Sequence, residues 1–255
     1  MTKTIAIAGK GGTGKTAIAA LLIKLLSQKG LVLAVDADPS TNLNLALGLP
    51  LGLKGTVGQV REKLTQDVSK GWASPTITKQ DYLFGGIMES LVESKGFDLL
   101  AMGRPEGPGC YCAPNEFLRA SLDKLVKDYK YRYIVMDSEA GMEHISRQTT
   151  RDVDILLIIS NPTMKSITVA ARIKELIGEL RTAVGRVALI VNRVNGTLPP
   201  EIEKAIADSG LELTATISED PYMGDLEIKG RPITELPQDS PLQQGVREIM
   251  RKLGL

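Results

Sequence analysis

The chain has 255 residues, of which 43% are hydrophobic and 24% charged, the composition of an ordinary globular protein with a sizeable core. Its formal net charge of +1 gives no bulk reason to bind nucleic acid or an anionic membrane, and no apolar run is long enough to cross a bilayer. Two cysteines cannot form a disulfide framework, and an apolar strand begins almost at once, so we expect a cytoplasmic protein without a signal peptide.

Short continuous apolar runs alternate with longer helical patterns along the chain. The runs suit parallel strands covered by helices on both faces, and they are Ile5–Ala8, Leu31–Val35, Asp98–Met102, Tyr133–Met136, Ile155–Ile159, Val187–Val191 and Leu213–Ile217. The helical patterns are Thr16–Gln28, Asn115–Tyr129, Ser166–Leu180 and Pro200–Asp208. This alternation predicts an α/β fold, a doubly wound and mostly parallel sheet with helices on both faces, in one domain over residues 1–255.

Two regions do not follow this pattern. Residues 50–97 form a long excursion with helical patches at Val57–Val68 and Ile87–Glu93, and residues 50–96 contain no motif that indicates a function. The segment Glu219–Ser240 is rich in proline, glycine and charge, which predicts a surface loop with a short helix. Ligands of open α/β sheets bind beyond the carboxyl ends of the strands, so we expect the functional residues in the loops that follow the apolar runs.

The loop after the first strand has the phosphate-binding pattern G-x-x-x-x-G-K-[ST] between a strand and a helix. Backbone N–H groups of such a glycine-rich turn, together with the helix N-terminus, bind phosphate oxygens. Lys15 is expected to reach the β- and γ-phosphates, and the Thr16 hydroxyl to hold Mg²⁺. The predicted nucleotide-binding residues here are Gly9, Lys10, Gly11, Gly12, Thr13, Gly14, Lys15, Thr16 and Ala17.

Acidic residues follow two further apolar runs. Asp36 and Asp38 come after the second run, and Asp137 ends the run that begins at Tyr133. A carboxylate at either place can hold Mg²⁺-bound water or orient the water that attacks the γ-phosphate. Asp36 has two open interpretations, a support that forms hydrogen bonds to the site or a residue that simply starts a turn. The P-loop, Asp38 and Asp137 together indicate a Mg-ATPase.

The second lysine of the loop, Lys10, places the chain in a narrower group. The run K-G-G-T-G-K-T resembles the deviant Walker A signature of the ParA/MinD, nitrogenase-iron-protein and arsenite-pump ATPases. The resemblance implies a dimer in which Lys10 reaches the partner's nucleotide, with Asp38 positioning water near Mg²⁺ and Asp137 contacting Mg²⁺ through its water shell. It also implies that the segment at Gly141 senses the γ-phosphate. Lys10, Lys15, Asp38 and Asp137 are therefore the predicted catalytic residues.

Asn192 is relevant to whether the bound nucleotide carries adenine or guanine. It follows the run Val187–Val191 and matches the position whose amide contacts adenine in this group, although asparagine also commonly ends strands. A guanine-type N-K-x-D is absent, because the run is Asn192-Arg193-Val194-Asn195. The resemblance implies ATP, and the residues alone do not exclude GTP.

Both cysteines of the chain, Cys110 and Cys112, lie in one proline-rich loop after the run Asp98–Met102. In an extended chain residues i and i+2 point to the same side, so the two thiolates could chelate one soft or borderline ion. Structural Zn²⁺ and thiolate-bound Ni²⁺ normally have four ligands, which a symmetric dimer would supply from two chains. The alternative is a pair of inert cysteines.

The residues around this loop narrow the resemblance. Phe97–Cys112 and Asp137–Arg147 resemble the CooC-type nickel-inserting ATPases, accessory proteins of carbon monoxide dehydrogenase and acetyl-CoA synthase. The resemblance implies a nucleotide- or metal-dependent homodimer that holds Ni²⁺, or Zn²⁺ in its place, between two C-x-C loops. It further implies delivery to apo carbon monoxide dehydrogenase or acetyl-CoA synthase, with no nucleic acid or membrane partner. We expect His144, the sole histidine, to lie outside the metal site.

Two other functions remain open at this stage. One is an iron–sulfur electron-transfer ATPase like the nitrogenase iron protein, whose cluster-binding cysteines lie in separate loops rather than one. The other is a ParA/MinD-like positioning ATPase, for which the amphipathic segment Leu242–Leu253 could lie on a membrane. Such a segment is more often a final helix packed on the sheet.

Overall fold

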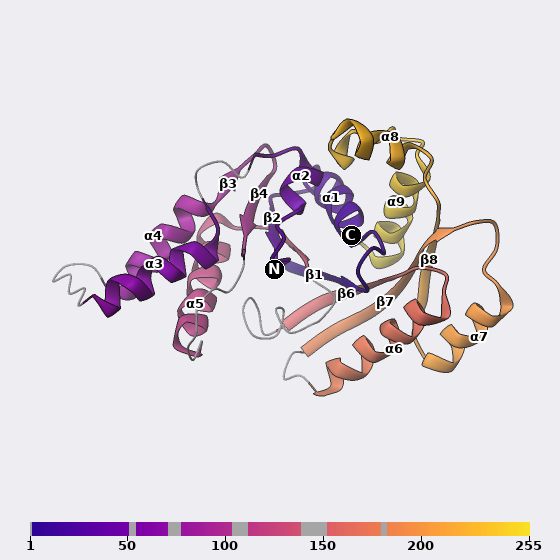
Figure 1. The fold of residues 1–255 in the computed structure, drawn as a ribbon, viewed down its shortest axis with the longest axis horizontal. Coiled ribbons are helices and arrows are strands. Elements are labelled where there is room, and N and C mark those ends of the chain that lie inside the picture. The colour runs from indigo at the N-terminus through magenta and orange to yellow at the C-terminus, as the bar shows by residue number, and fades with distance from the viewer. Residues whose placement is uncertain (1, 51–54, 71–77, 104–111, 139–151, 180–182) are drawn as a thin grey trace.

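Eight strands form one sheet in the order β3-β4-β2-β5-β1-β6-β7-β8 (Figure 1). The computed structural model describes residues 2–50, 55–70, 78–103, 112–138, 152–179 and 183–255. The strands are β1 (Lys3–Gly9), β2 (Val32–Asp36), β3 (Val92–Glu93), β4 (Phe97–Ala101), β5 (Tyr133–Asp137), β6 (Asp152–Ser160), β7 (Ala183–Val194) and β8 (Leu213–Ser218). Every strand predicted from an apolar run is confirmed, and its observed ends lie within a few residues of the predicted ones.

Helices cover both faces of this sheet. They are α1 (Lys15–Leu26), α2 (Leu43–Leu47), α3 (Val57–Ser69), α4 (Lys79–Ser90), α5 (Cys112–Tyr129), α6 (Met164–Glu179), α7 (Pro200–Ser209), α8 (Tyr222–Lys229), the short 3₁₀ helix η3 (Ile233–Glu235) and α9 (Pro241–Leu253). The mostly parallel, doubly wound α/β fold predicted from the sequence is therefore confirmed.

Alternate residues of each central strand face opposite cores. On β1, Ile5 and Ile7 belong to the core under α1, α2, α8 and α9, whereas Ala6 and Ala8 belong to the core under α3–α7. Because both faces are buried, the strands read as continuous apolar runs rather than as alternating patterns. The same geometry directs the polar residues of the chain to the strand ends.

The structure of the segment Ile87–Glu93 differs from the helix predicted for it. It was expected to be helical, but α4 ends at Ser90, and Val92 and Glu93 form β3, which pairs antiparallel with β4. The chain reverses at Gly96, whose φ of +85° favours glycine, and the Ser94 N–H donates to the Phe97 carbonyl over 3.0 Å. This tight reversal allows local strand pairing to replace the last turn of helix.

The segment Glu219–Ser240 contains the short helix that the sequence predicts, but the segment packs against the core instead of forming a surface loop. It contains α8 and η3, and Leu226, Ile233 and Leu236 are buried in the core beneath α1 and α9. Most of its charged residues are exposed, whereas these three apolar side chains point inward. Apolar side chains at helical spacing outweigh the proline and glycine content here.

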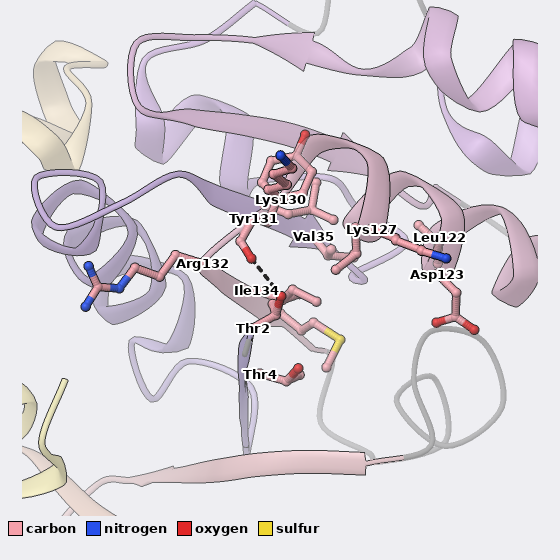
Figure 2. Close-up of a pocket in the computed structure, with 13 residues that line it drawn as sticks. Thr2, Thr4, Val35, Leu122, Asp123, Lys127, Lys130, Tyr131, Arg132 and Ile134 are labelled. Carbon is pink, nitrogen blue, oxygen red and sulfur yellow. Dashed lines mark hydrogen bonds between the residues drawn. The ribbon is translucent and has the colours of Figure 1, made fainter.

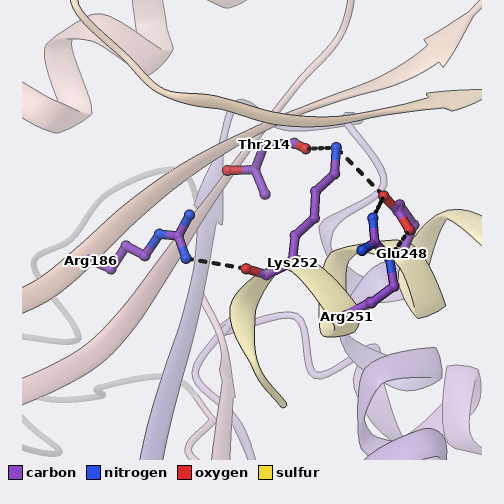
Figure 3. Close-up of polar contacts among 5 residues, drawn as sticks. All are labelled: Arg186, Thr214, Glu248, Arg251 and Lys252. Atoms are coloured by element: carbon purple, nitrogen blue, oxygen red, sulfur yellow. Dashed lines mark hydrogen bonds and ion pairs between the residues drawn. The ribbon is translucent and has the colours of Figure 1, made fainter.

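The final helix, α9, packs on the sheet. Its apolar residues Val246 and Ile249 are fully buried, and contacts with β8 and α1 cover this face. Two basic side chains tie its end to the sheet: the Lys252 ammonium donates to the Thr214 carbonyl over 2.8 Å, and Arg186 donates to the Lys252 carbonyl over 3.3 Å (Figure 3). The packed-helix interpretation is thus correct, and this face is not available to a membrane. Among the described helices, none is both long and apolar enough to span a bilayer.

Truncating the buried face of α9 should destabilise the fold. Ile249→Ala removes three buried carbons and leaves a cavity, so we expect a loss of about 2–5 kcal/mol in the free energy of unfolding, measured by urea denaturation. The matched control is Ile228→Ala on α8, whose side chain is 88% exposed and should change stability by less than about 0.5 kcal/mol. Equal losses in the two variants would contradict the packing of α9.

Candidate nucleotide site

The P-loop is shaped by close backbone contacts between β1 and its neighbours. Gly9 has a φ of +146°, and a Cβ there would lie 2.2 Å from the Ile159 carbonyl oxygen of β6. Gly14 has a φ of +92° and forms the N-cap of α1. Only glycine fits both positions, and the resulting turn directs backbone N–H groups at the start of α1 toward the pocket.

Lys15 and Thr13 both bind the backbone of the deviant lysine. The Thr13 hydroxyl donates to the Lys10 carbonyl over 2.8 Å, and the Lys15 ammonium donates to the same oxygen over 3.3 Å. Lys15 is buried, whereas the Lys10 side chain is partly exposed. A triphosphate would offer Lys15 stronger, charged acceptors than this carbonyl.

The two buried carboxylates lie side by side at the carboxyl ends of β2 and β5, where Asp36 pairs with Asp137 in the strand register. Asp36 accepts the Asp38 N–H on one oxygen (3.1 Å) and the Leu43 N–H on the other (3.0 Å). The Thr16 hydroxyl lies close enough to Asp137 to lower its pKa, and the Oδ1 of Asp137 is buried without a partner among the described residues. Asp36 is therefore a support for the turn that carries Asp38, rather than only a turn former.

Burial raises the pKa of both carboxyl groups. It raises the pKa of Asp36 to about 7, helped by the nearby Asp137 charge and opposed by the two backbone hydrogen bonds. It raises the pKa of Asp137 to about 6, opposed by the nearby Thr16 hydroxyl and the charge of Lys15. A cation beside these groups would remove much of this penalty.

Asp38 is partly exposed. Its Oδ1 accepts hydrogen bonds from the Ser40 N–H (2.8 Å) and the Ser40 hydroxyl (2.5 Å). Asp38 also lines the pocket formed by the P-loop. Thr16, Asp38 and the unpartnered oxygen of Asp137 are hard oxygen donors in one place, which is the donor set that Mg²⁺ prefers.

Asn192 is tied to the P-loop. Its Nδ2 donates to the Thr13 carbonyl over 2.9 Å, and its side chain is buried. This bond connects the carboxyl end of β7 to the turn that would hold phosphates. The predicted contact between Asn192 and adenine stays a prediction.

A cavity of about 700 Å³ lies over the P-loop. The P-loop and Asp38 line one part of it, and the remainder is formed by α2, by Arg193, and by α8 with the turn after it. Sequence reasoning missed Arg193 and the α8 wall. Their only signal was position, since both follow the carboxyl ends of strands.

A larger cavity, of about 860 Å³, lies beneath α5 near the amino ends of the central strands (Figure 2). The Thr2 hydroxyl donates to the Tyr131 carbonyl there over 2.7 Å, and Lys127, Lys130 and Arg132 lie at its rim. Its described lining contains no glycine-rich turn and one acidic residue, Asp123. The smaller cavity over the P-loop is therefore the candidate site.

The other predicted site residues fall outside what the structure describes. Cys110, Gly141 and His144 lie outside the described residues, and Cys112 is the first residue of α5, with its side chain outside them as well. The predicted thiolate site is thus untested. Within the described ranges, no group of three or more histidine, cysteine or acidic side chains has a metal-binding arrangement.

The pH dependence of stability should report Asp36. Between pH 4 and 7 the unfolded chain has ionised this carboxyl while the folded chain keeps its proton. Each rising pH unit should therefore lower the free energy of unfolding by up to about 1.4 kcal/mol. Asp36→Asn removes this contribution. We expect a shallower fall in stability from pH 4 to pH 7 in the variant, measured by urea denaturation, and equal slopes in the two proteins would contradict the assignment.

Comparison with known proteins places these features in a family. Residues 4–233 match the model of the CobQ/CobB/MinD/ParA nucleotide binding domain. An uncharacterized ATP-binding protein of Methanocaldococcus jannaschii is 41% identical, over 98% of this chain and 97% of its own length. The carbon monoxide dehydrogenase accessory protein CooC of Rhodospirillum rubrum is 34% identical, over 69% of each chain.

Solved structures show the same architecture. The MinD cell division protein of Aquifex aeolicus superposes with a TM-score of 0.69 and 25% identity, over 99% of this chain and 97% of that one. MinD of Pyrococcus horikoshii, solved in complex with Mg-ADP, has a TM-score of 0.69 and 23% identity, over 99% and 96% of the two chains.

Proposed function

Because the chain belongs to the CobQ/CobB/MinD/ParA family of P-loop ATPases, with ATP and Mg²⁺ as cofactors, we propose that it is a metallochaperone driven by ATP hydrolysis. It binds Ni²⁺ as cargo through Cys110 and Cys112 at a homodimer interface. It then delivers the nickel to apo carbon monoxide dehydrogenase or acetyl-CoA synthase. The likeness to CooC supports this proposal.

One observation connects the cysteines to the nucleotide site. At the carboxyl end of β4, the Met102 N–H donates to the Asp36 carbonyl over 2.8 Å. The chain carrying Cys110 and Cys112 follows directly after Gly103. Asp36 also holds Asp38, so one residue contacts both the turn expected to respond to the γ-phosphate and the strand that leads to the cysteines.

The proposed reaction is phosphoryl transfer to water by positioning and charge stabilisation. Asp38 orients the attacking water, while Lys15 and Lys10 of the partner subunit neutralise charge on the transferring phosphoryl group. Thr16 and Asp38 would hold Mg²⁺, with Asp137 contacting its water shell, and the ion supplies positive charge to the phosphate oxygens. No covalent intermediate with the protein is required.

Metal titration under anaerobic conditions tests the cargo site. We expect one Ni²⁺ per two chains by calorimetry, with an absorbance band from thiolate ligation that disappears in Cys110→Ala and in Cys112→Ala. Affinity should rise with pH, because thiolate ligands release protons when they bind metal. Lys15→Ala serves as the control, since it removes a phosphate contact and leaves both cysteines in place. Nickel binding that survives both cysteine substitutions would refute the proposal.

The two lysines of the P-loop should fail in different ways. Lys15→Ala should abolish tight binding of Mg-ADP, because it removes the buried cation beside the phosphates. Lys10→Ala should bind Mg-ADP normally and lose hydrolysis by on the order of 10³-fold, as for other cations supplied in trans. Calorimetry and phosphate release measure the two effects. Full hydrolysis by Lys10→Ala would show that no lysine acts across a dimer.

A ParA/MinD-like positioning ATPase is the second candidate, and the likeness to Aquifex aeolicus MinD supports it. The burial of the apolar face of α9 disfavours its membrane-bound form. ATP-dependent sedimentation with liposomes, together with failure of the nickel titration, would favour this candidate over the metallochaperone.

A further inference from the structure

The carboxylate of Asp38 is held by one neighbouring residue, Ser40. The backbone of Asp38 is fixed separately, because its N–H donates to Asp36 over 3.1 Å and its carbonyl accepts the Thr41 N–H over 3.0 Å. The Ser40 N–H and the Ser40 hydroxyl both donate to Oδ1 of Asp38, over 2.8 Å and 2.5 Å. In the described part of the chain no group donates to Oδ2, so the two oxygens of this carboxylate differ in their surroundings.

The Ser40 hydroxyl is in turn oriented by Asn42. The Asn42 Nδ2 donates to the Ser40 Oγ over 2.8 Å. Because an amide nitrogen is only a donor, the Ser40 oxygen is the acceptor in this bond, and its own proton goes to Asp38. The three side chains therefore form a row of hydrogen bonds with a single direction, from Asn42 through Ser40 to Asp38. Bonds arranged in this way polarise and strengthen one another.

The backbone between Ser40 and Asn42 has an unfavourable conformation. Thr41 has a φ of +50°, a left-handed value that is rare for a residue with a branched side chain. It lies between the two residues whose side chains meet. Such a conformation persists only where its surroundings fix it, and it is found most often at functional sites.

The row of hydrogen bonds lies at the nucleotide site and is open to solvent. Asp38 and Asn42 both line the cavity over the P-loop, and Ser40 connects them. Ser40 and Asn42 are exposed, whereas the Asp36–Leu43 bond that anchors the turn is buried. Water competes for exposed hydrogen-bonding groups, so the row contributes little to folding. Its location therefore indicates a role in the chemistry of the site.

We infer that Ser40 is a positioning residue for hydrolysis, whose hydroxyl holds Oδ1 of Asp38 so that Oδ2 faces the attacking water. The inference rests on the role of Asp38 in the proposed function. The water donates a hydrogen bond to Oδ2, and its oxygen bonds to the γ-phosphorus while the bond from phosphorus to ADP breaks. One proton of the water stays on the phosphate product and the other leaves to solvent. Ser40 acts only through Asp38 and exchanges no proton with the water.

The test separates kcat from binding. Ser40→Ala keeps the backbone N–H and removes the hydroxyl, so kcat for ATP hydrolysis should fall about tenfold, as expected for a lost hydrogen bond to a charged group. The KM for ATP and the Kd for Mg-ADP should stay within about twofold of wild type, because Ser40 does not act on the nucleotide itself. Phosphate release and calorimetry measure these quantities, and an unchanged Tm shows that the fold is intact.

Two further serine substitutions make the result specific. Ser40→Thr keeps a hydroxyl on the same carbon and should restore most of kcat. Ser69→Ala is the matched control, since it removes a hydroxyl that donates to the Gln66 carbonyl on α3, and it should leave kcat unchanged. A normal kcat in Ser40→Ala, or an equal loss in Ser40→Thr, would overturn the inference. A rise in the Kd for Mg-ADP as large as the loss in kcat would also overturn it, because Ser40 would then act on binding.

Asn42→Ala tests whether the row acts as a unit. Since Asn42 acts on Asp38 through Ser40, the double variant Ser40→Ala/Asn42→Ala should have nearly the same kcat as Ser40→Ala alone. Losses in kcat that multiply in the double variant would contradict the row.

Asp38→Asn distinguishes this inference from the function on which it rests. The variant should lose hydrolysis by about 100-fold or more, because the water is no longer oriented. Normal hydrolysis by Asp38→Asn would refute both the proposed role of Asp38 and the inference. An inactive Asp38→Asn together with a fully active Ser40→Ala would refute the inference alone. Neither result depends on nickel, so the titration of the cysteine pair is a separate test.

Discussion

The carboxyl end of β2 holds the site together, because Asp36 and Ala37 make four hydrogen bonds there to neighbouring segments. The Asp36 carboxylate accepts the N–H groups of Asp38 and Leu43, the Asp36 carbonyl accepts the Met102 N–H, and the Ala37 N–H donates to the Asp137 carbonyl. No single bond of this kind contributes much more than about 1–3 kcal/mol. Together they connect the Asp38 turn, β4 and β5 to one another at the end of β2.

This arrangement is unfavourable for the protein without its ligands. Two neighbouring carboxyl groups are buried, and the raised pKa values of Asp36 and Asp137 measure how poorly the fold accommodates their charges. The unpartnered Oδ1 of Asp137 adds a desolvated acceptor without a donor. Since Lys15 meanwhile donates to a backbone carbonyl, the site has a buried cation and two buried carboxyl groups that a Mg²⁺–phosphate group can satisfy together. Binding energy is therefore built into the electrostatics of the site.

Sequence alone predicted the features that depend on local pattern. The strand runs, the P-loop and the helix Thr16–Gln28 have strong periodicity or fixed glycine positions, and these were confirmed as β-strands, turn and α1. The features it missed depend on tertiary contacts. β3 forms because Gly96 allows a reversal against β4, and η3 and the packing of the predicted short helix, α8, depend on the burial of Leu226 and its neighbours. Arg193 could not be recognised as a residue lining the cavity, because its φ of +59° and the register shift between β7 and β8 at this point follow no pattern of residue types.

The order of the strands sets the distance between the nucleotide site and the end of β4, after which the cysteines follow in the sequence. β4, which leads to the cysteines, is separated from β1 and its P-loop by β2 and β5, a distance of about 14 Å for three strand spacings. A phosphate bound at Lys15 is thus too far from the exit of β4 for direct contact. The ends of the two intervening strands are the positions of Asp36 and Asp137, which lie side by side between the P-loop and the end of β4. Under the proposed function, these two buried carboxyl groups are the residues through which a bound nucleotide would act on β4.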